Sequence, residues 1–235
     1  MKLVVFDLDG TLIDINPIED EAFVTAFREE LGIDCTTTDW SQFEFVTNAG
    51  IAGAFMEAVE EPLRTEALRR VRRRFVDLLE RGSASRAFRP IRGAAALIEH
   101  LRRTDWRAVI ATGCWRSSVE VKLRSSGLEG LLPFISSDED RSREGIVRRA
   151  IALAAEQHAS EFDRIVMIGD ASWDVRTARK LALPFVGVGS QPDLLLRLGA
   201  TQVLRDFEDV DAVIAVLESA VVPASIGQFR GSPSS

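Results

Sequence analysis

The first dozen residues constrain this chain more than any other stretch. Leu3 to Phe6 is a short, continuous run of aliphatic and aromatic residues. Such a run predicts a strand that is buried on both faces, as strands are inside a parallel sheet. It ends at Asp7, and Gly10 then lets the chain turn away. We therefore expect an α/β fold with Asp7 and Asp9 at the carboxyl end of a strand, where open α/β sheets bind ligands.

The pair Asp7 and Asp9 has two explanations. Two crowded carboxylates repel each other, and a cation beside them removes the conflict, so hard oxygen ligands at this density suit Mg²⁺. The alternative is a strand that ends in two solvated turn acids, as many strands do. The spacing of the two residues does not by itself separate these interpretations.

Composition limits the class of protein. With 235 residues, 46% of them hydrophobic, the chain can bury the core of one sizeable domain, or of a core domain with a smaller insert. The net charge of −7 argues against nonspecific nucleic-acid binding, which needs a basic surface. Cys35 and Cys114 are too few for a disulfide scaffold, and no apolar run reaches membrane-spanning length. We expect a cytoplasmic protein without nucleic-acid or membrane partners.

The sequence predicts a helical insert after the first strand. Apolar residues recur at helical spacing from Ile18 to Leu31, and Gly32 stands where a helix C-cap is expected. Two further helical stretches cover about residues 48–60 and 62–82. Because no strand pattern appears in this interval, we expect residues 14–90 to form one small, all-helical unit.

The predicted insert is unevenly charged. Residues 14–60 contain eleven acidic residues and one arginine, whereas residues 61–92 contain ten arginines and four acidic residues. A nucleic-acid or phosphate-rich partner could explain the arginines between Arg69 and Arg74. We favour a solvated helix face that pairs with the acidic half, because the arginines spread around the helix and no aromatic residues interleave for base stacking.

After residue 90 the pattern alternates between strands and helices. Short apolar strands are predicted at residues 107–111, 132–135, 164–168, 183–188 and 200–203. Helices are predicted at residues 91–103, 117–126, 146–159, 175–181 and 207–217. This alternation indicates a parallel, Rossmann-like sheet core formed by residues 1–13 and 91–220. Residues 221–235, rich in Ser, Gly and Pro, are expected to be a disordered tail.

Two further polar motifs follow predicted strands. Thr112-Gly113 ends the second strand, and Gly169-Asp170-Ala-Ser-Trp-Asp174 follows the fourth. Together with Asp7-Leu-Asp9-Gly10-Thr11-Leu12, they stand in the order found in the haloacid dehalogenase (HAD) superfamily of phosphohydrolases. The chain resembles this superfamily from residue 2 to about residue 217.

The third motif departs from the family pattern. The family usually has a lysine here, often followed by proline, just before a helix, but this sequence offers Arg141 and Arg143. Arginine keeps the charge and adds a planar fork that can pair with phosphate and carboxylates. Arg141 fits the Lys-Pro spacing and Arg143 fits another family spacing. We favour Arg143 and keep both as candidates.

The resemblance implies a site for phosphoryl transfer. Asp7 would be the nucleophile and Asp9 the general acid/base. Mg²⁺ would be held by Asp7, by the backbone carbonyl of Asp9 and by Asp170. Asp174 would bind the ion through water or steady the cation of the third motif. The phosphoryl oxygens would be held by residues of the first three motifs, namely Gly10, Thr112, Gly113 and the third-motif arginine.

Cys114 and Trp115 directly follow the second motif. A thiol at this place could be a nucleophile, but no histidine lies nearby in the sequence and Asp7 already fills that role. We therefore interpret Cys114 as a small packing residue. Trp115 is expected in the core or in the wall of a cleft.

We accordingly expect a HAD fold with a small helical cap and the activity of a Mg²⁺-dependent phosphatase. Its substrate would be a small, soluble phosphate monoester, and by analogy with the family we expect a phosphoglycolate-like ester or a sugar phosphate. The reaction would pass through an aspartyl-phosphate intermediate on Asp7. Dehalogenases of the superfamily lack an acid at the position of Asp9, which argues for phosphate chemistry. The activity of a phosphomutase is an alternative that the sequence leaves open. A non-catalytic relative would be expected to have lost Asp7, Asp9 or Asp170, and all three are present. The sequence does not determine the oligomeric state.

Overall fold

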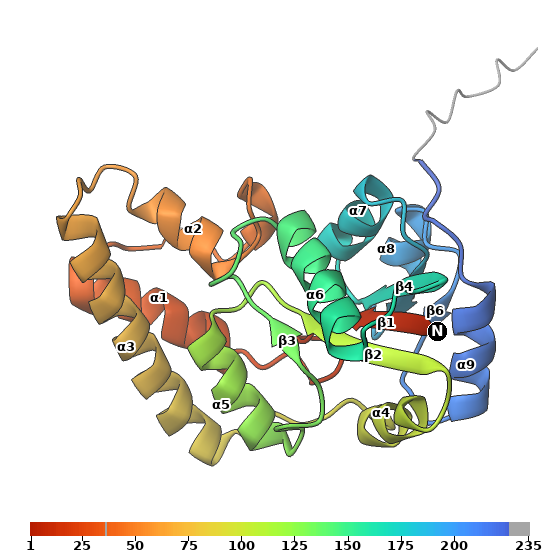
Figure 1. The fold of residues 1–235 in the computed structure, drawn as a ribbon. Helices are drawn as coiled ribbons and strands as arrows, with labels where there is room; N and C mark the ends of the chain where they lie inside the picture. Colours follow the sequence, from red (N-terminus) through yellow and green to blue (C-terminus); the bar gives the residue numbers. More distant parts are fainter. Residues whose placement is uncertain (36, 226–235) are drawn as a thin grey trace, which may run out of the picture.

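The computed structural model describes residues 1–35 and 37–225, which form a parallel sheet surrounded by helices (Figure 1). The strand order is β3-β2-β1-β4-β5-β6. The strands are β1 (Lys2–Phe6), β2 (Trp106–Ala111), β3 (Phe134–Ile135), β4 (Arg164–Gly169), β5 (Phe185–Val188) and β6 (Val203–Leu204). The α/β fold class expected from the sequence is therefore confirmed.

The register of the central strands determines where the motifs meet. β1 pairs in parallel with β2 on one side and β4 on the other, and Phe6 lies opposite both Ile110 and Ile168. These three strands therefore end at the same level. Asp7 and Asp170 directly follow β1 and β4, so residues more than 160 positions apart in the chain become neighbours at one sheet edge.

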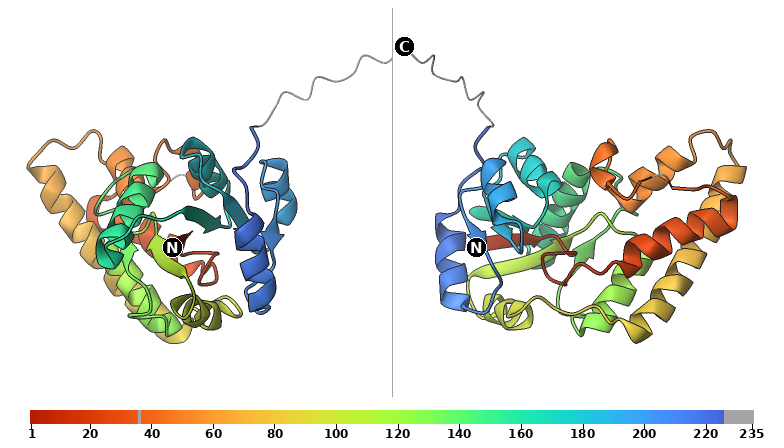
Figure 2. Two further views of the ribbon diagram at one scale, coloured as in Figure 1. Left: turned by 45° about the vertical axis from the view of Figure 1, so that its right-hand side comes forward. Right: turned by 180° about the vertical axis from the view of Figure 1, so that it is seen from behind.

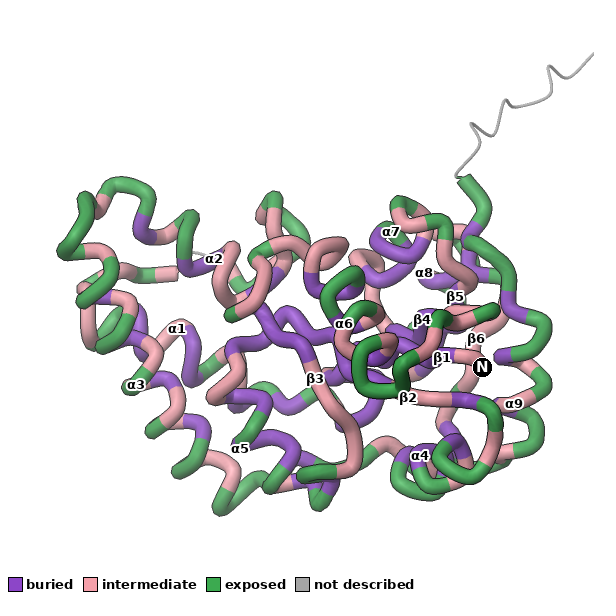
Figure 3. Tube along the Cα trace, in the orientation of Figure 1, coloured by how far each residue is buried: buried purple, intermediate pink, exposed green. Residues whose placement is uncertain are grey.

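Helices cover both faces of the sheet, with α4 and α9 on one face and α6 and α7 on the other. The helices of the described chain are α1 (Ile18–Leu31), α2 (Asn48–Phe55), α3 (Leu63–Ser85), α4 (Ala94–Arg102), α5 (Arg116–Ser126), α6 (Arg143–His158), α7 (Ser172–Lys180), α8 (Pro192–Arg197) and α9 (Val210–Ser219). Val4 and Phe6 point into an apolar cluster with α4 and α9, whereas Leu3 and Val5 point into a second cluster with α6 and α7. Burial on both faces (Figure 3) explains why β1 is a continuous apolar run rather than an alternating one.

Residues 14–90 after β1 are helical, as predicted, and their helices α1, α2 and α3 lie beyond the carboxyl ends of the central strands (Figures 1 and 2). α1 packs against α3, and α3 also contacts α5, which follows β2. The Phe23 ring centroid lies 5.7 Å from that of Phe75 and 5.5 Å from that of Trp115. Trp115 is 1% exposed, so it occupies a core position, one of the two places expected for it.

The arginine-rich helix α3 pairs only partly as predicted. Two of its arginines bind acidic residues of α1, in the contacts Arg74–Glu29 (2.6 Å) and Arg70–Glu30 (3.4 Å). Arg72 differs, because it pairs with Asp138 and stacks on Trp115, with its guanidinium carbon 4.9 Å from the ring centroid. The helical segment is thus held to the sheet region by charge as well as by aromatic packing.

Element boundaries differ from the prediction where a polar cap decides them. α6 begins at Arg143 rather than at Ile146, because the Ser142 hydroxyl accepts a hydrogen bond from the Gly145 N–H at 3.1 Å. α8 is absent from the sequence prediction, and the expected edge strand at 200–203 forms at Val203–Leu204. Helical periodicity locates only the apolar positions of a helix, whereas an N-cap can make the helix begin several residues before the first apolar position.

Residues 221–225, at the start of the predicted tail, are hydrogen-bonded to the sheet region. The Val221 carbonyl accepts from the Phe185 N–H at 3.1 Å, and the Ala224 N–H donates to the Gly199 carbonyl at 3.0 Å. The rest of the predicted tail, residues 226–235, lies outside the described residues. Within the described chain, no helix is both long enough and apolar enough to cross a membrane.

Gly93 offers a test of the packing between α4 and the loop before α9. It has φ +80°, and a Cβ there would lie 2.1 Å from the Phe207 carbonyl oxygen. We expect Gly93→Ala to lower the free energy of unfolding by about 2 kcal/mol or more, because positive-φ strain and a backbone clash add together. Gly127→Ala is the matched control, since φ is +73° but nothing lies within 4 Å. Urea unfolding measures both, and equal losses would contradict the packing.

Candidate active site

Three buried or half-buried carboxylates meet at the carboxyl edge of the sheet. Asp7 follows β1 and is 8% exposed, Asp170 follows β4, and Asp174 lies in the first turn of α7 and is 2% exposed. Each can offer an oxygen atom that lies within 4.8 Å of those of the other two. The structure thus brings together the carboxylates of three residues predicted to hold a metal, whereas Asp9 was expected to contribute its backbone carbonyl.

Gly10 is required for this close approach. It has φ +76°, and a Cβ at this position would lie 2.0 Å from the Asp170 Oδ2 atom. A side chain larger than hydrogen would therefore push Asp170 away from the sheet edge. The Gly10 N–H donates to the Ile13 carbonyl at 2.8 Å, which closes the turn after Asp9. Gly10 thus acts through the shape of the turn, and its N–H is already engaged.

Arg143 is the cation that pairs with two of the three carboxylates, those of Asp7 and Asp174. Its Nη1 donates to Asp7 Oδ1 at 2.8 Å and lies 3.8 Å from Asp174 Oδ1, while its Nε donates to the Val46 carbonyl at 2.9 Å. The Ser142 cap makes Arg143 the first residue of α6 and so places it at the sheet edge. The fork of the guanidinium can therefore bind Asp7 and the backbone at once.

Arg141, the other candidate for the third motif, does not reach the carboxylates. Its guanidinium carbon lies 4.6 Å from the centroid of the Phe45 ring, and its carbonyl accepts from the Thr47 hydroxyl at 2.8 Å. The contacts of the two side chains therefore favour Arg143 as the cation of the site.

The negative charge of the three carboxylates at this edge is only partly balanced by Arg143. Burial, with a smaller contribution from Asp174, raises the pKa of Asp7 to about 7 despite the opposing charge of Arg143. Burial also raises the pKa of Asp170 and of Asp174 above the usual range, and neighbouring carboxylates add to the effect. Crowded oxygen ligands that are hard to ionise together are a donor set that fits a hard divalent cation such as Mg²⁺.

Thr112 and Gly113 directly follow β2, where the second motif was expected, and Gly113 lies beside Arg143. Thr112 is 1% exposed, and its hydroxyl accepts from the Cys114 N–H at 3.2 Å. A Cβ on Gly113 would lie 2.8 Å from Arg143 Nη2, and the Gly113 carbonyl accepts from the Asn48 N–H at 2.7 Å. The second motif thus contacts both the cation of the site and the start of α2.

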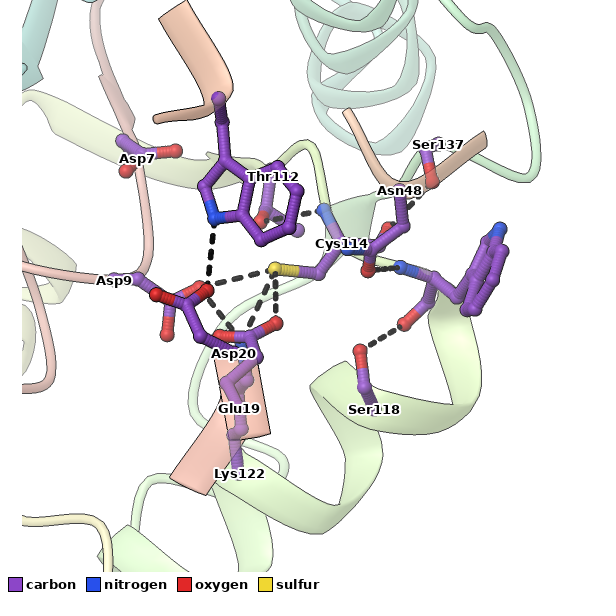
Figure 4. Close-up of polar contacts among 12 residues, drawn as sticks. Asp7, Asp9, Glu19, Asp20, Asn48, Thr112, Cys114, Ser118, Lys122 and Ser137 are labelled. Carbon is purple, nitrogen blue, oxygen red and sulfur yellow. Dashed lines mark hydrogen bonds and ion pairs between the residues drawn. The ribbon is translucent and has the colours of Figure 1, made fainter. Parts of the chain in front are cut away.

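The Asp9 side chain lies in a second cluster, together with Glu19 and Cys114 (Figure 4). Its Oδ2 accepts from the Lys122 ammonium at 2.7 Å and lies 3.0 Å from Cys114 Sγ. Lys122 also pairs with Glu19 of α1 and lies 3.1 Å from Cys114 Sγ. Cys114 is buried in the main apolar cluster, as expected of a packing residue, but its sulfur also lies among polar groups, which the sequence did not indicate.

Lys122 and Glu19 are the functional candidates that sequence reasoning missed. Lys122 is completely buried, and it shares the inward face of α5 with Val119 and Ser126. A lysine in an inward-facing helical stripe was the available signal. Burial alone lowers the pKa of Lys122, but its acidic neighbours outweigh this effect and raise it well above the usual value, so the side chain is an ammonium.

A cavity of about 320 Å³ lies between the two clusters and the helical segment. Its charged lining residues are Asp9, Glu19, Asp20, Arg143 and Asp170. Its apolar walls include Phe23, Trp40, Ile51, Trp173 and Leu194. Residues of α1, α2 and the segment between them line this cavity together with Asp9, Arg143 and Asp170, so the helical segment shapes the space in front of these three side chains.

The profile of the haloacid dehalogenase-like hydrolase family matches residues 4–188. The chain therefore belongs to this hydrolase family, and the family expected from the sequence is confirmed. It is 26% identical over 195 residues to a phosphoglycolate phosphatase of Synechococcus elongatus, which covers 80% of this chain and 84% of that protein.

Two solved structures share the fold. A hydrolase from Pseudomonas syringae has a TM-score of 0.67 and 21% identity, covering 92% of this chain and 98% of that one. CbbY from Rhodobacter sphaeroides in complex with phosphate has a TM-score of 0.66 and 21% identity, covering 88% of this chain and 95% of that one. At this identity the likeness establishes the fold.

The assignment of the third motif can be tested with inorganic phosphate. We expect Arg143→Met to weaken phosphate binding in the presence of Mg²⁺ by about 10- to 100-fold, because a hydrogen bond to a charged group contributes about 1.5–3 kcal/mol. Arg141→Met is the matched control and should change the affinity by less than about twofold. Isothermal titration calorimetry measures both, and the opposite order of losses would transfer the role to Arg141.

Proposed function

We propose that this chain is a Mg²⁺-dependent phosphatase that hydrolyses a small phosphate monoester through an aspartyl-phosphate on Asp7. The observation that carries the proposal is the buried Asp7 carboxylate, which is 2.8 Å from Arg143 and beside Asp170 and Asp174 at one sheet edge. A nucleophile, a phosphate-binding cation and a metal-binding pair of acids are thus adjacent. Membership of the hydrolase family supports the same conclusion.

Asp7, Asp170 and the Asp9 carbonyl would hold the ion, with Asp174 behind them. When bound, Mg²⁺ supplies positive charge that offsets the repulsion between a carboxylate and a phosphoryl group. The carboxylate of Asp7 attacks phosphorus, and the bond from phosphorus to the leaving oxygen breaks. Arg143 and the Thr112 hydroxyl stabilise the phosphoryl oxygens during this displacement.

Asp9 supplies the proton transfers. It donates a proton to the oxygen of the leaving alcohol, and then accepts one from the water that hydrolyses the aspartyl-phosphate. Asp9 is two residues from Asp7 and lines the cavity in which the alcohol part of the ester would lie. Asp7 contacts Arg143 at the sheet edge, whereas Asp9 lines the cavity, so the two aspartates would carry out different steps.

Residues 14–90 would act as a cap over a core formed by residues 1–13 and 91–220. This segment contributes Glu19, Asp20 and Phe23 of α1 and Asn48 and Ile51 of α2 to the cavity. It therefore determines which alcohol parts can enter, while the sheet edge determines the chemistry.

The charges of the cavity favour an ester that carries no second anionic group. Arg143, already engaged with Asp7, is the one cationic side chain that lines the cavity in the described chain. Asp20 accepts from the Trp40 indole N–H at 2.8 Å and faces the same space as Glu19. A carboxylate on the substrate, as in phosphoglycolate, would lie near these acids.

The same argument disfavours a phosphomutase. Such an enzyme must hold a second phosphate away from the nucleophile while the first is transferred, and that requires a second cationic subsite. Among the described residues that line the cavity, no cation besides Arg143 offers one. Hydrolysis of a monoester needs only the site at Asp7.

The first test is the hydrolysis of an aryl phosphate with Mg²⁺ or with EDTA. Turnover should require Mg²⁺, and Asp7→Asn should lower it by at least about 1,000-fold, because the amide is a poor nucleophile. Asp193→Asn, on the exposed face of α8, is the control and should behave as wild type. Full activity in folded Asp7→Asn would rule out the proposed mechanism.

The substrate class is tested by comparing two esters of similar size. We expect kcat/KM for 2-hydroxyethyl phosphate to exceed that for phosphoglycolate by about tenfold or more, because the carboxylate meets like charges in the cavity. Asp20→Asn should narrow this ratio, whereas Glu57→Gln, an exposed change on the same segment, should leave it unaltered. A preference for phosphoglycolate in the wild type would overturn the assignment.

A further inference from the structure

A buried ammonium group lies directly behind Asp9 (Figure 4). Lys122 of α5 is completely buried, and its Nζ lies 2.7 Å from Asp9 Oδ2 and also pairs with Glu19. It is not among the residues that line the cavity, whereas Asp9, Glu19 and Cys114 are. Lys122 can therefore act on a substrate only through the groups in front of it.

The two carboxylate oxygens of Asp9 differ in their contacts. Oδ2 accepts from the Lys122 ammonium and lies 3.0 Å from Cys114 Sγ. Oδ1 has no hydrogen-bond partner among the contacts of the described chain. Because Oδ2 is held from behind, Oδ1 is the atom left to exchange a proton with a group in the cavity.

The position of Lys122 is itself determined by packing. α5 is anchored at its start, because the Trp115 N–H donates to Asn48 Oδ1 at 2.8 Å and the Ser118 hydroxyl donates to the Trp115 carbonyl at 2.9 Å. The Lys122 ammonium also lies 5.8 Å from the centroid of the Phe88 ring. A buried ammonium without access to water has to be held by its carboxylate partners.

We propose that Lys122 is a positioning residue that orients Asp9 Oδ1 toward the leaving oxygen, and that Glu19 makes this orientation depend on the seated helical segment. Glu19 belongs to α1, Lys122 to α5 and Asp9 to the turn after β1, so one ammonium joins the cap to the sheet edge. The inference rests on the proposed function, because it concerns the proton that Asp9 transfers there. Lys122 itself gains and loses no proton in the reaction.

The test compares two leaving groups in Lys122→Met. 2-Hydroxyethyl phosphate releases a basic alkoxide that needs a proton, whereas 2,4-dinitrophenyl phosphate releases a stable phenolate that does not. We measure the rate of leaving-group release in a single turnover, because kcat also contains the later hydrolysis of the aspartyl-phosphate, which Asp9 assists for both esters. We expect this rate to fall by about 100-fold for the first ester, the usual effect of losing general acid catalysis, and by less than about fivefold for the second. A purely structural role would lower both rates by the same factor, and that outcome would overturn the proposal.

Two controls separate the contributions. Lys180→Met removes an exposed lysine that pairs with Glu144 outside the cavity, and both rates should equal those of wild type. Glu19→Gln keeps the Lys122–Asp9 contact, so it should lower the rate with 2-hydroxyethyl phosphate less than Lys122→Met does. If Lys122→Met does not fold, the double variant Lys122→Met/Glu19→Gln replaces it, because this variant removes one carboxylate charge together with the ammonium. Compared with Glu19→Gln, the double variant should have a lower rate with 2-hydroxyethyl phosphate and a nearly unchanged rate with 2,4-dinitrophenyl phosphate.

The outcomes distinguish this inference from the proposed function. If the wild type hydrolyses neither ester, the proposed function fails and the inference fails with it. If the wild type hydrolyses both, Asp7→Asn hydrolyses neither, and the Lys122 variants lose both rates equally, then the phosphatase stands and only the role of Lys122 is wrong.

Discussion

Electrostatic repulsion among buried carboxylates is the constraint on which the site depends. Asp7, Asp170 and Asp174 offer oxygen atoms within 4.8 Å of one another, and the first and last of these side chains are buried. Such an arrangement is unfavourable unless positive charge is supplied. Arg143 supplies part of it, and the remaining deficit is what makes the edge suitable for a divalent cation.

The chain separates its acidic residues into two groups, each with its own cation. Arg143 faces Asp7, and Lys122 faces Asp9, although the two aspartates are only two residues apart. The turn at Gly10 directs their side chains to different neighbours. Proposed nucleophilic attack and proposed proton transfer thus use separate carboxylates, and each carboxylate is oriented by a cation from a helix that follows a different strand.

The helical segment of residues 14–90 is joined to the sheet edge by several kinds of contact. The Asn48 N–H donates to the Gly113 carbonyl, Glu19 pairs with Lys122, and Arg72 pairs with Asp138. Aromatic packing of Phe23 against Trp115 adds an apolar contact. These interactions connect the side that would select a substrate to the side that would react with it.

Local sequence patterns predicted much of this fold. The continuous apolar run at Leu3–Phe6 predicted a doubly covered strand, and the motif order predicted the family, because buried parallel strands and their polar ends leave short-range signals. The start of α6 was misplaced, because the Ser142 cap and not the apolar periodicity decides it. α8 was missed because its six residues are too few to show a helical period.

The sequence by itself therefore determined the fold class, the hydrolase family and the residues that follow each strand. Only the tertiary structure decided which arginine reaches Asp7, and that Cys114, Lys122 and Glu19 surround Asp9. The physical reason is that strand and helix periods depend on neighbours a few residues apart. The partner of a buried charge depends on which distant segments the sheet register and helix packing bring within hydrogen-bonding distance.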